Sequence, residues 1–217
     1  MDSNDSGGTV GAAPWNDLVR FRSAGTGPPV VRASLESFEA LYRDDPDPWR
    51  FATSAYEQRR YDLTAAVLQR PRYRRCFEPG CAIGELTRRL ARRCDTVVAL
   101  EPSSSALAVA RDRLRALSNV DLRAGALPED WPEGDFDLVV LSEVGYYFET
   151  EGVRYLAERT LASLAKGGEV VAAHWRGRSE DHLLHADAVH AELRRELGPP
   201  VCQYEQAEFR LDLWSPA

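Results

Sequence analysis

Short apolar runs alternate with segments of helical spacing between residues 75 and 175, and this alternation constrains the fold more than any other feature. Strands and helices that alternate in this way form βαβ units, which pack as a parallel sheet between helices. We therefore predict an α/β domain. The expected strands are 75–78, 96–101, 120–124, 136–142 and 169–175, and the expected helices between them are 84–93, 104–116 and 152–164.

The segments outside this alternation complete the predicted domain organisation. Residues 1–33 are rich in Gly, Ser, Ala, Asp and Pro and are expected to form a disordered tail. Two helical patterns, separated by Pro46 and Pro48, predict a helical cover over 34–70, and 71–217 would be the main domain. Toward the C-terminus, the expected elements are a helix over 186–197 and an antiparallel strand pair at one sheet edge, 202–206 with 209–214.

Composition excludes several classes of function. Acidic residues outnumber basic ones and the formal net charge is −7, so no surplus of Lys and Arg is present to neutralise the phosphates of a nucleic acid. No apolar run reaches the ~18 residues of a membrane span, and the first residues lack the basic and apolar start of a signal peptide. The four cysteines lack paired metal spacing. We expect a cytoplasmic monomer or homodimer without a metal, bound neither to nucleic acid nor to a membrane.

The strongest local motif is E-P-G-C-A-I-G at 78–84, between a predicted strand and a predicted helix. Glycines at such a turn let the backbone pass close to a ligand, and the N–H groups at the start of the helix point toward it. Small residues at a turn of this kind can also serve packing alone. The motif by itself therefore leaves both interpretations open.

A second feature favours a ligand site. The next predicted strand ends at Glu101, 17 residues after Gly84, where a carboxylate can accept both hydroxyl groups of a ribose. The alternative is that Glu101 only stabilises the N-terminus of the helix that follows Pro102. Strand, glycine turn, helix, strand and terminal acid together predict a site that binds a nucleoside.

The spacing of the glycines narrows the choice of nucleoside ligand. A dinucleotide site prefers G-x-G-x-x-G, but Ala82 stands at the second glycine position and no third glycine follows Gly84 as expected. Glu78 would repel a diphosphate, whereas it suits a ligand that carries a sulfonium and an ammonium group. A nicotinamide-dependent reductase is the alternative.

Four blocks of the sequence carry a resemblance to a known family. They are D-P-W-R-F-A-T-S-A-Y-E-Q-R-R-Y (47–61), E-P-G-C-A-I-G (78–84), F-D-L-V-V-L-S-E-V-G-Y-Y (136–147) and L-A-K-G-G-E-V-V-A-A-H-W (164–175). The chain resembles class I S-adenosylmethionine-dependent methyltransferases, and among them the NodS-like (nodulation protein S) N-methyltransferases. The resemblance implies a Rossmann-like fold with a mostly parallel sheet, an antiparallel edge pair and an N-terminal helical cover.

The resemblance also implies which residues contact the cofactor S-adenosylmethionine. Gly125-Ala126-Leu127 lacks the acid that often accepts the adenine amino group, so adenine would rest on backbone groups and Leu127. Trp49 and Tyr56 would pack on the ligand, although aromatic residues at helical spacing also bury a helix against a sheet. The expected cofactor residues are Trp49, Tyr56, Glu78, Gly80, Cys81, Gly84, Glu101, Pro102, Ala126, Leu127, Ser142, Glu143 and Val144.

Methyl transfer to an amine requires that the nitrogen has a free lone pair, so a protonated amine needs a proton acceptor. We expect His174, Glu143 or Tyr147 to serve in catalysis, since all three follow or end predicted strands. The alternative for His174 is a buried histidine with satisfied hydrogen bonds, and the alternative for Tyr147 is a residue that only lines the pocket. The expected function is N-methylation of a small molecule such as an amino sugar. O-methylation and cofactor binding without catalysis stay open.

Overall fold

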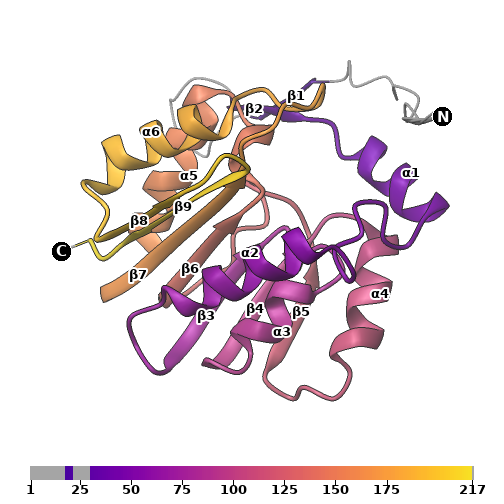
Figure 1. Ribbon diagram of the computed structural model, residues 1–217, viewed down its shortest axis with the longest axis horizontal. Coiled ribbons are helices and arrows are strands. Elements are labelled where there is room, and N and C mark those ends of the chain that lie inside the picture. Colours follow the sequence, from indigo (N-terminus) through magenta and orange to yellow (C-terminus); the bar gives the residue numbers. More distant parts are fainter. Residues whose placement is uncertain (1–17, 22–29, 217) are drawn as a thin grey trace, which may run out of the picture.

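A seven-stranded sheet forms the centre of the molecule, with strand order β5-β4-β3-β6-β7-β9-β8 (Figure 1). The computed structural model describes residues 18–21 and 30–216. Strands β3 to β7 pair in parallel, whereas β9 runs antiparallel to both β7 and β8. The strands are β3 (Tyr73–Pro79), β4 (Cys94–Glu101), β5 (Val120–Ala124), β6 (Phe136–Ser142), β7 (Leu164–Trp175), β8 (Cys202–Glu205) and β9 (Phe209–Trp214). The predicted α/β fold with an antiparallel edge pair is confirmed.

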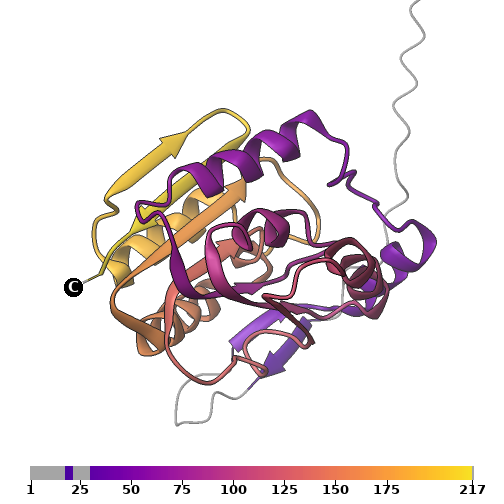
Figure 2. The same cartoon turned by 90° about the horizontal axis from the view of Figure 1, so that it is seen from below.

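Helices cover both faces of this sheet (Figures 1 and 2). One face carries α2 (Ala55–Ala66), α3 (Glu85–Leu90) and α4 (Ser104–Leu114), and the other carries α5 (Thr150–Ser163) and α6 (Ala186–Leu197). Helix α1 (Glu36–Asp44) packs against α4 beyond the sheet. Among the described residues, no helix is both long and apolar enough to cross a bilayer.

Side chains of the central strands alternate between two apolar cores. In β6, Leu138 and Val140 join the core under α2 and α3, whereas Val139 and Leu141 join the core under α5 and α6. Successive strand side chains point to opposite faces of a sheet, and here both faces are covered. This explains why the predicted strands read as almost continuous apolar runs.

The topology fixes where a ligand can bind. From the central β3 the chain builds β4 and β5 on one side, and then crosses to build β6 and β7 on the other. The strand order therefore reverses between β3 and β6, whose carboxyl ends lie side by side. Crevices at such a reversal are the usual ligand sites of open α/β sheets.

Several element boundaries differ from the sequence prediction by one or two residues, and two differ by three residues or more. Strand β7 begins at Leu164, directly after α5, and not at residue 169, because Leu164 already pairs with Phe136 before a register shift in the ladder. Helix α3 ends at Leu90 and not at 93, since Arg92 and Arg93 turn into β4.

The predicted tail over 1–33 contains a pair of strands. β1 (Leu18–Phe21) and β2 (Val30–Ala33) pair antiparallel, and β2 lies beside α5. The tail prediction is wrong for these segments, whose apolar residues find backbone partners in each other. The other residues of 1–33 lie outside the described residues.

Candidate functional site

A cavity of about 390 Å³ opens at the carboxyl ends of β3, β4, β6 and β7, beneath α1 and the start of α2. Volumes of this size are typical of small-molecule sites. Ten residues predicted from the sequence line it: Trp49, Tyr56, Gly80, Glu101, Pro102, Ala126, Leu127, Glu143, Val144 and Tyr147. The predicted Glu78, Cys81, Gly84, Ser142 and His174 do not line it.

The glycine turn joins β3 to α3 and is fixed to the end of β4. The N–H groups of Gly80 and Cys81 both donate to the carbonyl oxygen of Leu100, at 2.7 and 3.0 Å. Gly80 has φ +69°, and a Cβ atom there would lie 2.7 Å from a methyl group of Val144. Gly84 has φ +83°, and its Cβ would collide with Leu114 of α4. Gly80 therefore keeps the cavity floor open, whereas Gly84 serves packing between helices.

Glu101 ends β4 at the cavity wall. One carboxylate oxygen accepts the Ala82 N–H and the other accepts the Ser103 N–H, both at 2.8 Å. Burial raises the pKa of this carboxyl to about 7, against the lowering effect of the two hydrogen bonds. Each carboxylate oxygen has two lone pairs, so the group can still accept the hydroxyl hydrogens of a ribose. Both sequence interpretations of Glu101, helix N-terminus and cavity acid, apply at once.

The side chains of Glu78, at the end of β3, and Cys81, in the glycine turn, are buried and do not line the cavity. Burial raises the pKa of Glu78 to about 8, and one of its oxygens has no hydrogen-bond partner among the described residues. The Cys81 thiol is buried and its sulfur contacts the carbonyl of Ala82. These two predicted cofactor contacts therefore belong to the buried interior and not to the cavity lining.

The wall formed after β5 consists of Gly125, Ala126 and Leu127, as predicted. The Ala126 N–H is already taken by the carboxylate of Asp130, at 2.9 Å. Sequence analysis had not singled out Asp130. This leaves apolar surface and the carbonyl groups of the wall for an adenine ring.

Helix α1 and the loop after it close the cavity from above. Glu39 of α1 accepts hydrogen bonds from the hydroxyl groups of Ser103, Ser104 and Ser105 at the start of α4. These bonds lower the pKa of Glu39 to about 2. Trp49 is 38% exposed at the cavity mouth, where its ring packs on those of Tyr42 and Phe51. Trp49 is thus part of an aromatic roof and is not buried against the sheet.

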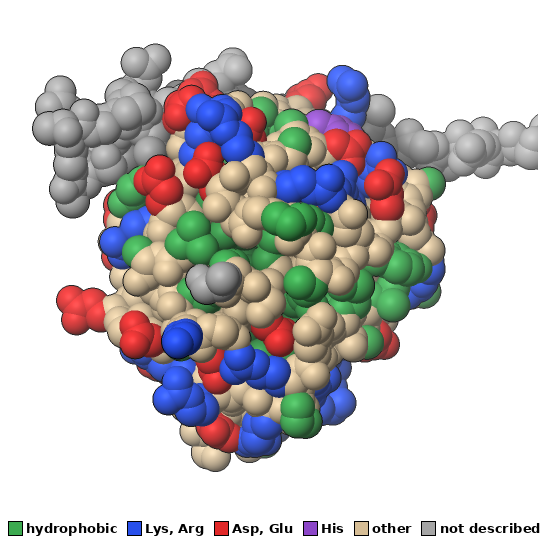
Figure 3. Space-filling view, turned by 90° about the vertical axis from the view of Figure 1, so that its left-hand side faces the viewer, with side chains coloured by type: hydrophobic (Ala, Val, Ile, Leu, Met, Phe, Trp, Pro, Cys, Tyr) green, Lys and Arg blue, Asp and Glu red, His purple; other side chains and the backbone are tan. Residues whose placement is uncertain are grey.

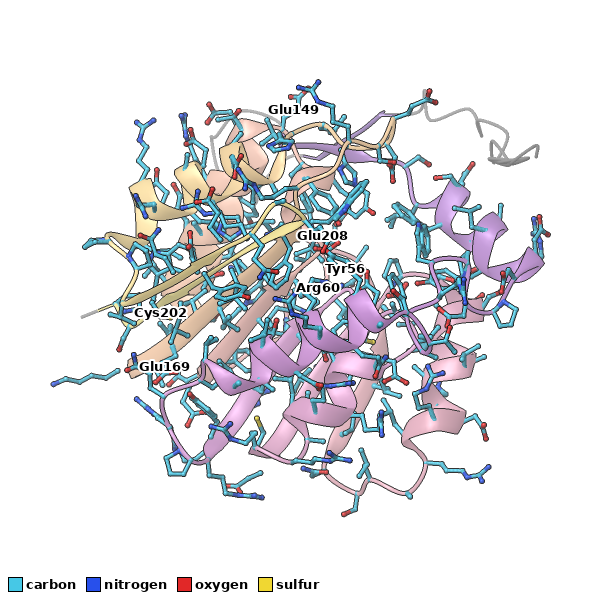
Figure 4. All side chains as sticks on the ribbon, viewed as in Figure 1. Tyr56, Arg60, Glu149, Glu169, Cys202 and Glu208 are labelled. Carbon is cyan, nitrogen blue, oxygen red and sulfur yellow. The ribbon has the colours of Figure 1, made fainter. Side chains whose placement is uncertain are left out.

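Helix α2 contributes a buried ion pair beside the cavity. The Arg60 guanidinium pairs with Glu57, donates to the Ser142 hydroxyl at 2.9 Å and lies 3.5 Å from Glu143. Figure 4 shows Arg60 and Tyr56 together near Glu208, far from Glu169 at the other end of the sheet. Tyr56 lines the cavity and donates to the Glu208 carbonyl at 3.4 Å. Arg60, buried in this network, does not line the cavity.

The loop after β6 presents Glu143 to the cavity in a left-handed conformation, with φ +58°. Its carboxylate accepts the Trp175 N–H at 2.7 Å and the Tyr146 hydroxyl at 2.6 Å. Burial raises the pKa of Glu143, while nearby Arg60 opposes the shift. Strained backbone of this kind persists where surrounding contacts fix it, as is common in binding sites.

His174 lies behind this loop and not in the cavity. Its ring is fully buried and its Nε2 accepts the Gly145 N–H at 3.0 Å. The proton of the neutral ring must then sit on Nδ1, which donates to His190 Nε2, and His190 Nδ1–H donates to Asp212. Burial lowers the pKa of His174. The expectation that His174 accepts a proton from the substrate is therefore corrected, because both of its nitrogens are occupied.

The cavity lining also includes two acids that sequence analysis did not assign to the site, Glu57 and Asp181, together with His182. Glu57 belongs to the sequence block 47–61, whereas Asp181 and His182 follow β7 in an irregular segment without a motif. Four lining residues are acids, Glu57, Glu101, Glu143 and Asp181, and among the described lining residues no Lys or Arg occurs. These negatively charged carboxylates suit a ligand that combines a positive charge with a ribose, such as S-adenosylmethionine. They disfavour a negatively charged diphosphate. No cluster of metal-ligand type occurs in the described part of the chain.

The strand order, the glycine turn, the strand-end acid and the acidic cavity together define a class I S-adenosylmethionine-dependent methyltransferase. The family model described as Nodulation protein S (NodS) matches residues 37–197. The chain belongs to this family, as its sequence blocks had indicated.

Individual relatives agree with this assignment. Nodulation protein S of Sinorhizobium fredii is 29% identical over 171 residues, which cover 75% of this chain and 79% of that protein. A methyltransferase structure from Pseudomonas syringae is 41% identical with a TM-score of 0.67 and covers 75% of this chain and 99% of that one. The N-methyltransferase NodS of Bradyrhizobium japonicum WM9, in complex with S-adenosylhomocysteine, has a TM-score of 0.72 at 24% identity, over 83% and 97% of the two chains.

Proposed function

We propose that this protein transfers the methyl group of S-adenosylmethionine to the nitrogen of a small-molecule amine, with an amino sugar as the first acceptor to test. The single observation that carries this proposal is the cavity lining, which combines four carboxylates with aromatic rings. Among the described residues that line the cavity, none is a Lys or an Arg. Carboxylates attract an ammonium group and aromatic faces add cation–π attraction. Carboxylates attract a neutral phenol less strongly than an ammonium group, and they repel a phosphorylated acceptor.

One region of the cavity would bind the cofactor and the other would bind the acceptor. We define the cofactor end as the part lined by Gly80, Glu101 and Ala126, and the acceptor end as the part lined by Glu143, Tyr147 and Asp181. Glu101 would hold the ribose, and the turn at Gly80 would lie under the methionine part. The cofactor supplies an electrophilic methyl group, so the protein has to align the acceptor nitrogen and exclude water.

At the acceptor end, Glu143 and Tyr147 would orient the acceptor. The Glu143 carboxylate is already fixed by the Trp175 N–H and the Tyr146 hydroxyl, which gives it one direction toward the cavity. Tyr147 packs edge-on against Phe38 of the α1 roof, with ring centroids 4.9 Å apart. A rigid carboxylate and a rigid ring are suited to positioning.

The surface supports a small-molecule acceptor over a nucleic acid. Figure 3 shows that on the face at the left of Figure 1, Lys and Arg side chains are interspersed with Asp and Glu around hydrophobic groups. Together with the net charge of −7, this arrangement offers little to a phosphate backbone. NodS of B. japonicum is described as an N-methyltransferase, which also favours nitrogen as the accepting atom.

Two measurements test the proposal. S-adenosylhomocysteine should raise the melting temperature whereas NAD should not, since only a ligand of the native state stabilises it. A mass-shift screen with S-adenosylmethionine and a panel of amines, amino sugars and phenols should then show a 14 Da gain on amines, the mass of one CH₂. Methylation of phenols alone would indicate an O-methyltransferase, and binding without any turnover would indicate a cofactor-binding protein.

A matched pair of variants tests the acceptor end. Glu143→Gln should lower the turnover of the amine at least about tenfold, because a neutral amide holds an ammonium less well. Glu149→Gln removes the same charge at an exposed position on the far side of the same loop (Figure 4) and should leave turnover unchanged. Equal activity of the two variants would contradict the role of Glu143.

A further inference from the structure

Asp181 is a buried acid at the acceptor end of the cavity, and one of its carboxylate oxygens accepts no hydrogen bond from the described residues. It lies between β7 and α6, is 5% exposed and lines the cavity. Its Oδ1 atom has no hydrogen-bond partner among the described residues. His182 Nε2 lies 4.0 Å away, beyond hydrogen-bond distance, and burial lowers the pKa of that imidazole. The lowered pKa favours the neutral form of this neighbouring ring.

The other three cavity acids differ from Asp181 in this respect. Glu57 pairs with the Arg60 guanidinium, and Glu101 accepts two backbone N–H groups. Glu143 accepts a backbone N–H and the Tyr146 hydroxyl. A buried charged group without a partner is costly to a fold and is rare in native structures. Such a group points to a ligand that completes its hydrogen bonds when the site is filled.

Contacts with the loop after β6 hold Asp181 in place. The N–H groups of Leu183 and Leu184 donate to the carbonyl oxygen of Tyr146, at 2.8 and 3.2 Å. The His182 ring stacks on the Tyr146 ring, with centroids 3.7 Å apart. The carboxylate is thus fixed to the acceptor end, and three strands separate β7 from β5 and the adenine wall.

Given the proposed amine acceptor, we infer that Asp181 is the catalytic residue that takes the proton from the ammonium form of the acceptor. The N–H bond breaks, the proton moves to Oδ1 of Asp181 and the electron pair stays on nitrogen. Nitrogen then bonds to the methyl carbon that the cofactor supplies, while the carbon–sulfur pair goes to sulfur. One positive charge leaves the sulfonium and one appears on the methylated nitrogen, so charge balances. Glu143, fixed by two donors, orients the acceptor and leaves the proton to Asp181.

The first test asks whether Asp181 has a structural role or serves the cofactor. Asp181→Asn keeps the shape but removes the unpaired charge, and Glu180→Gln makes the same change in charge at the exposed neighbour. Without ligand, Asp181→Asn should melt about 2–4 °C higher than the wild type, since the buried charge is gone. Its affinity for S-adenosylhomocysteine should stay within about twofold. A lower melting temperature or a tenfold loss of that affinity would overturn the inference.

A second test measures the ammonium site without turnover. Benzylammonium, titrated into protein saturated with S-adenosylhomocysteine, should bind the wild type and Glu180→Gln alike and bind Asp181→Asn at least about tenfold more weakly. No binding to the wild type, or equal binding to Asp181→Asn, overturns the inference. Because no methyl group moves in this experiment, its result does not depend on whether the acceptor of the proposed function has been found.

The third test is the pH profile of an amine that the screen shows to be methylated. At pH 7, Asp181→Asn should reduce kcat/KM by about a hundredfold or more, the usual size of a proton-transfer effect. Activity should return as the pH rises toward the pKa of the acceptor amine, where neutral amine is present without a proton acceptor. A loss that is the same at every pH would overturn the inference, and amines of lower pKa should be affected less.

Discussion

The cofactor end and the acceptor end of the cavity share one sheet edge but are built in different ways. At the cofactor end, backbone groups are held by a single acid: Glu101 accepts N–H groups from Ala82 and Ser103, in segments directly joined to β3 and β4. At the acceptor end, the loop that carries Glu143 rests on side chains that hold one another, in the chain from His174 through His190 to Asp212. The first arrangement depends on a short motif, whereas the second depends on residues brought together from three elements.

This difference indicates which amino-acid substitutions each end of the cavity tolerates. A site built on backbone groups keeps its shape under most substitutions, because every residue supplies the same N–H and C=O groups. A side-chain network loses several bonds when one member changes, since each partner is then left unsatisfied. We therefore expect the acceptor end to be the more fragile part of the structure and the cofactor end the more specific for its ligand.

Replacing His174 should have the largest effect. His174→Phe leaves the Gly145 N–H and His190 without their partners, which should lower the free energy of unfolding by about 2–4 kcal/mol. Urea denaturation measures this, and the affinity of the folded protein for S-adenosylhomocysteine should hardly change. His185→Ala removes a half-exposed N-cap of α6 and should cost about 1 kcal/mol. Equal losses in the two variants would contradict the contrast between the ends.

Glu101→Gln should have the next largest effect. It should mainly reduce the affinity for the cofactor and should change the stability of the fold less. Charge-assisted hydrogen bonds to two ribose hydroxyls are each worth roughly 1.5–3 kcal/mol, so the affinity for S-adenosylhomocysteine should fall at least about tenfold. The melting temperature without ligand should fall by less than the ligand-induced shift, because the amide nitrogen of Gln cannot accept one of the two N–H groups that Glu101 holds, whereas the cost of burying a charge is removed. Calorimetry on the variant decides: an unchanged affinity would mean that Glu101 serves only the glycine turn and α4.

The pH should act in opposite directions on stability and on binding through Glu101. Its pKa of about 7 in the folded protein exceeds the usual 4.5, so the native state binds more protons than the unfolded state between these values. Stability without ligand should therefore fall as the pH rises through this window. Affinity for S-adenosylhomocysteine should instead fall up to about tenfold from pH 8 to 6, as the carboxylate is protonated. A flat binding profile would count against Glu101 as the ribose acceptor.

The roof over the cofactor end should show the smallest effect. Residues 47–61 should exchange amide hydrogens a few-fold more slowly once S-adenosylhomocysteine is bound, because a site must open to release product and close to exclude water. Glu39→Gln weakens the bonds of α1 to the serines of α4 and should speed exchange in α1. Exchange that the ligand leaves unchanged would mean that the roof is static.

The sequence predicted the fold and the cofactor end for a physical reason. Gly80 and Glu101 belong to strands that are neighbours in both sequence and space, so a local spacing carries the geometry. The antiparallel edge pair was likewise a local pattern. Gly84 serves packing between helices, whereas Gly80 lines the cavity. The φ angle of Gly84 and its contact with Leu114 show this, and neither can be read from the sequence.

The acceptor end escaped prediction because its chemistry depends on burial. His174 stands at the end of a strand, as a catalytic histidine often does, but its neighbours Gly145 and His190 occupy both ring nitrogens. Asp181 lies in an irregular segment without a motif, and only the folded chain shows that one of its oxygens is buried and unpaired. The spacing of apolar residues in a sequence predicts which residues are buried. It does not predict which hydrogen bonds the buried polar residues form.

The buried Arg60 determines how ligands can enter and leave. Its guanidinium ties α2 to Ser142 and Glu143 at the end of β6, and withdrawing one partner of a buried ion pair typically costs about 3–5 kcal/mol. Helix α2 therefore cannot swing away during each catalytic cycle. Helix α1 is held by the buried Tyr42, by the packing of Phe38 on Tyr147 and by the hydrogen bonds of Glu39 to the start of α4. These are packing contacts and hydrogen bonds to serines, unlike the buried ion pair that holds α2. Among the described residues, we therefore expect α1 and Trp49 to open when the product leaves, and the rate of that opening would set an upper limit on turnover.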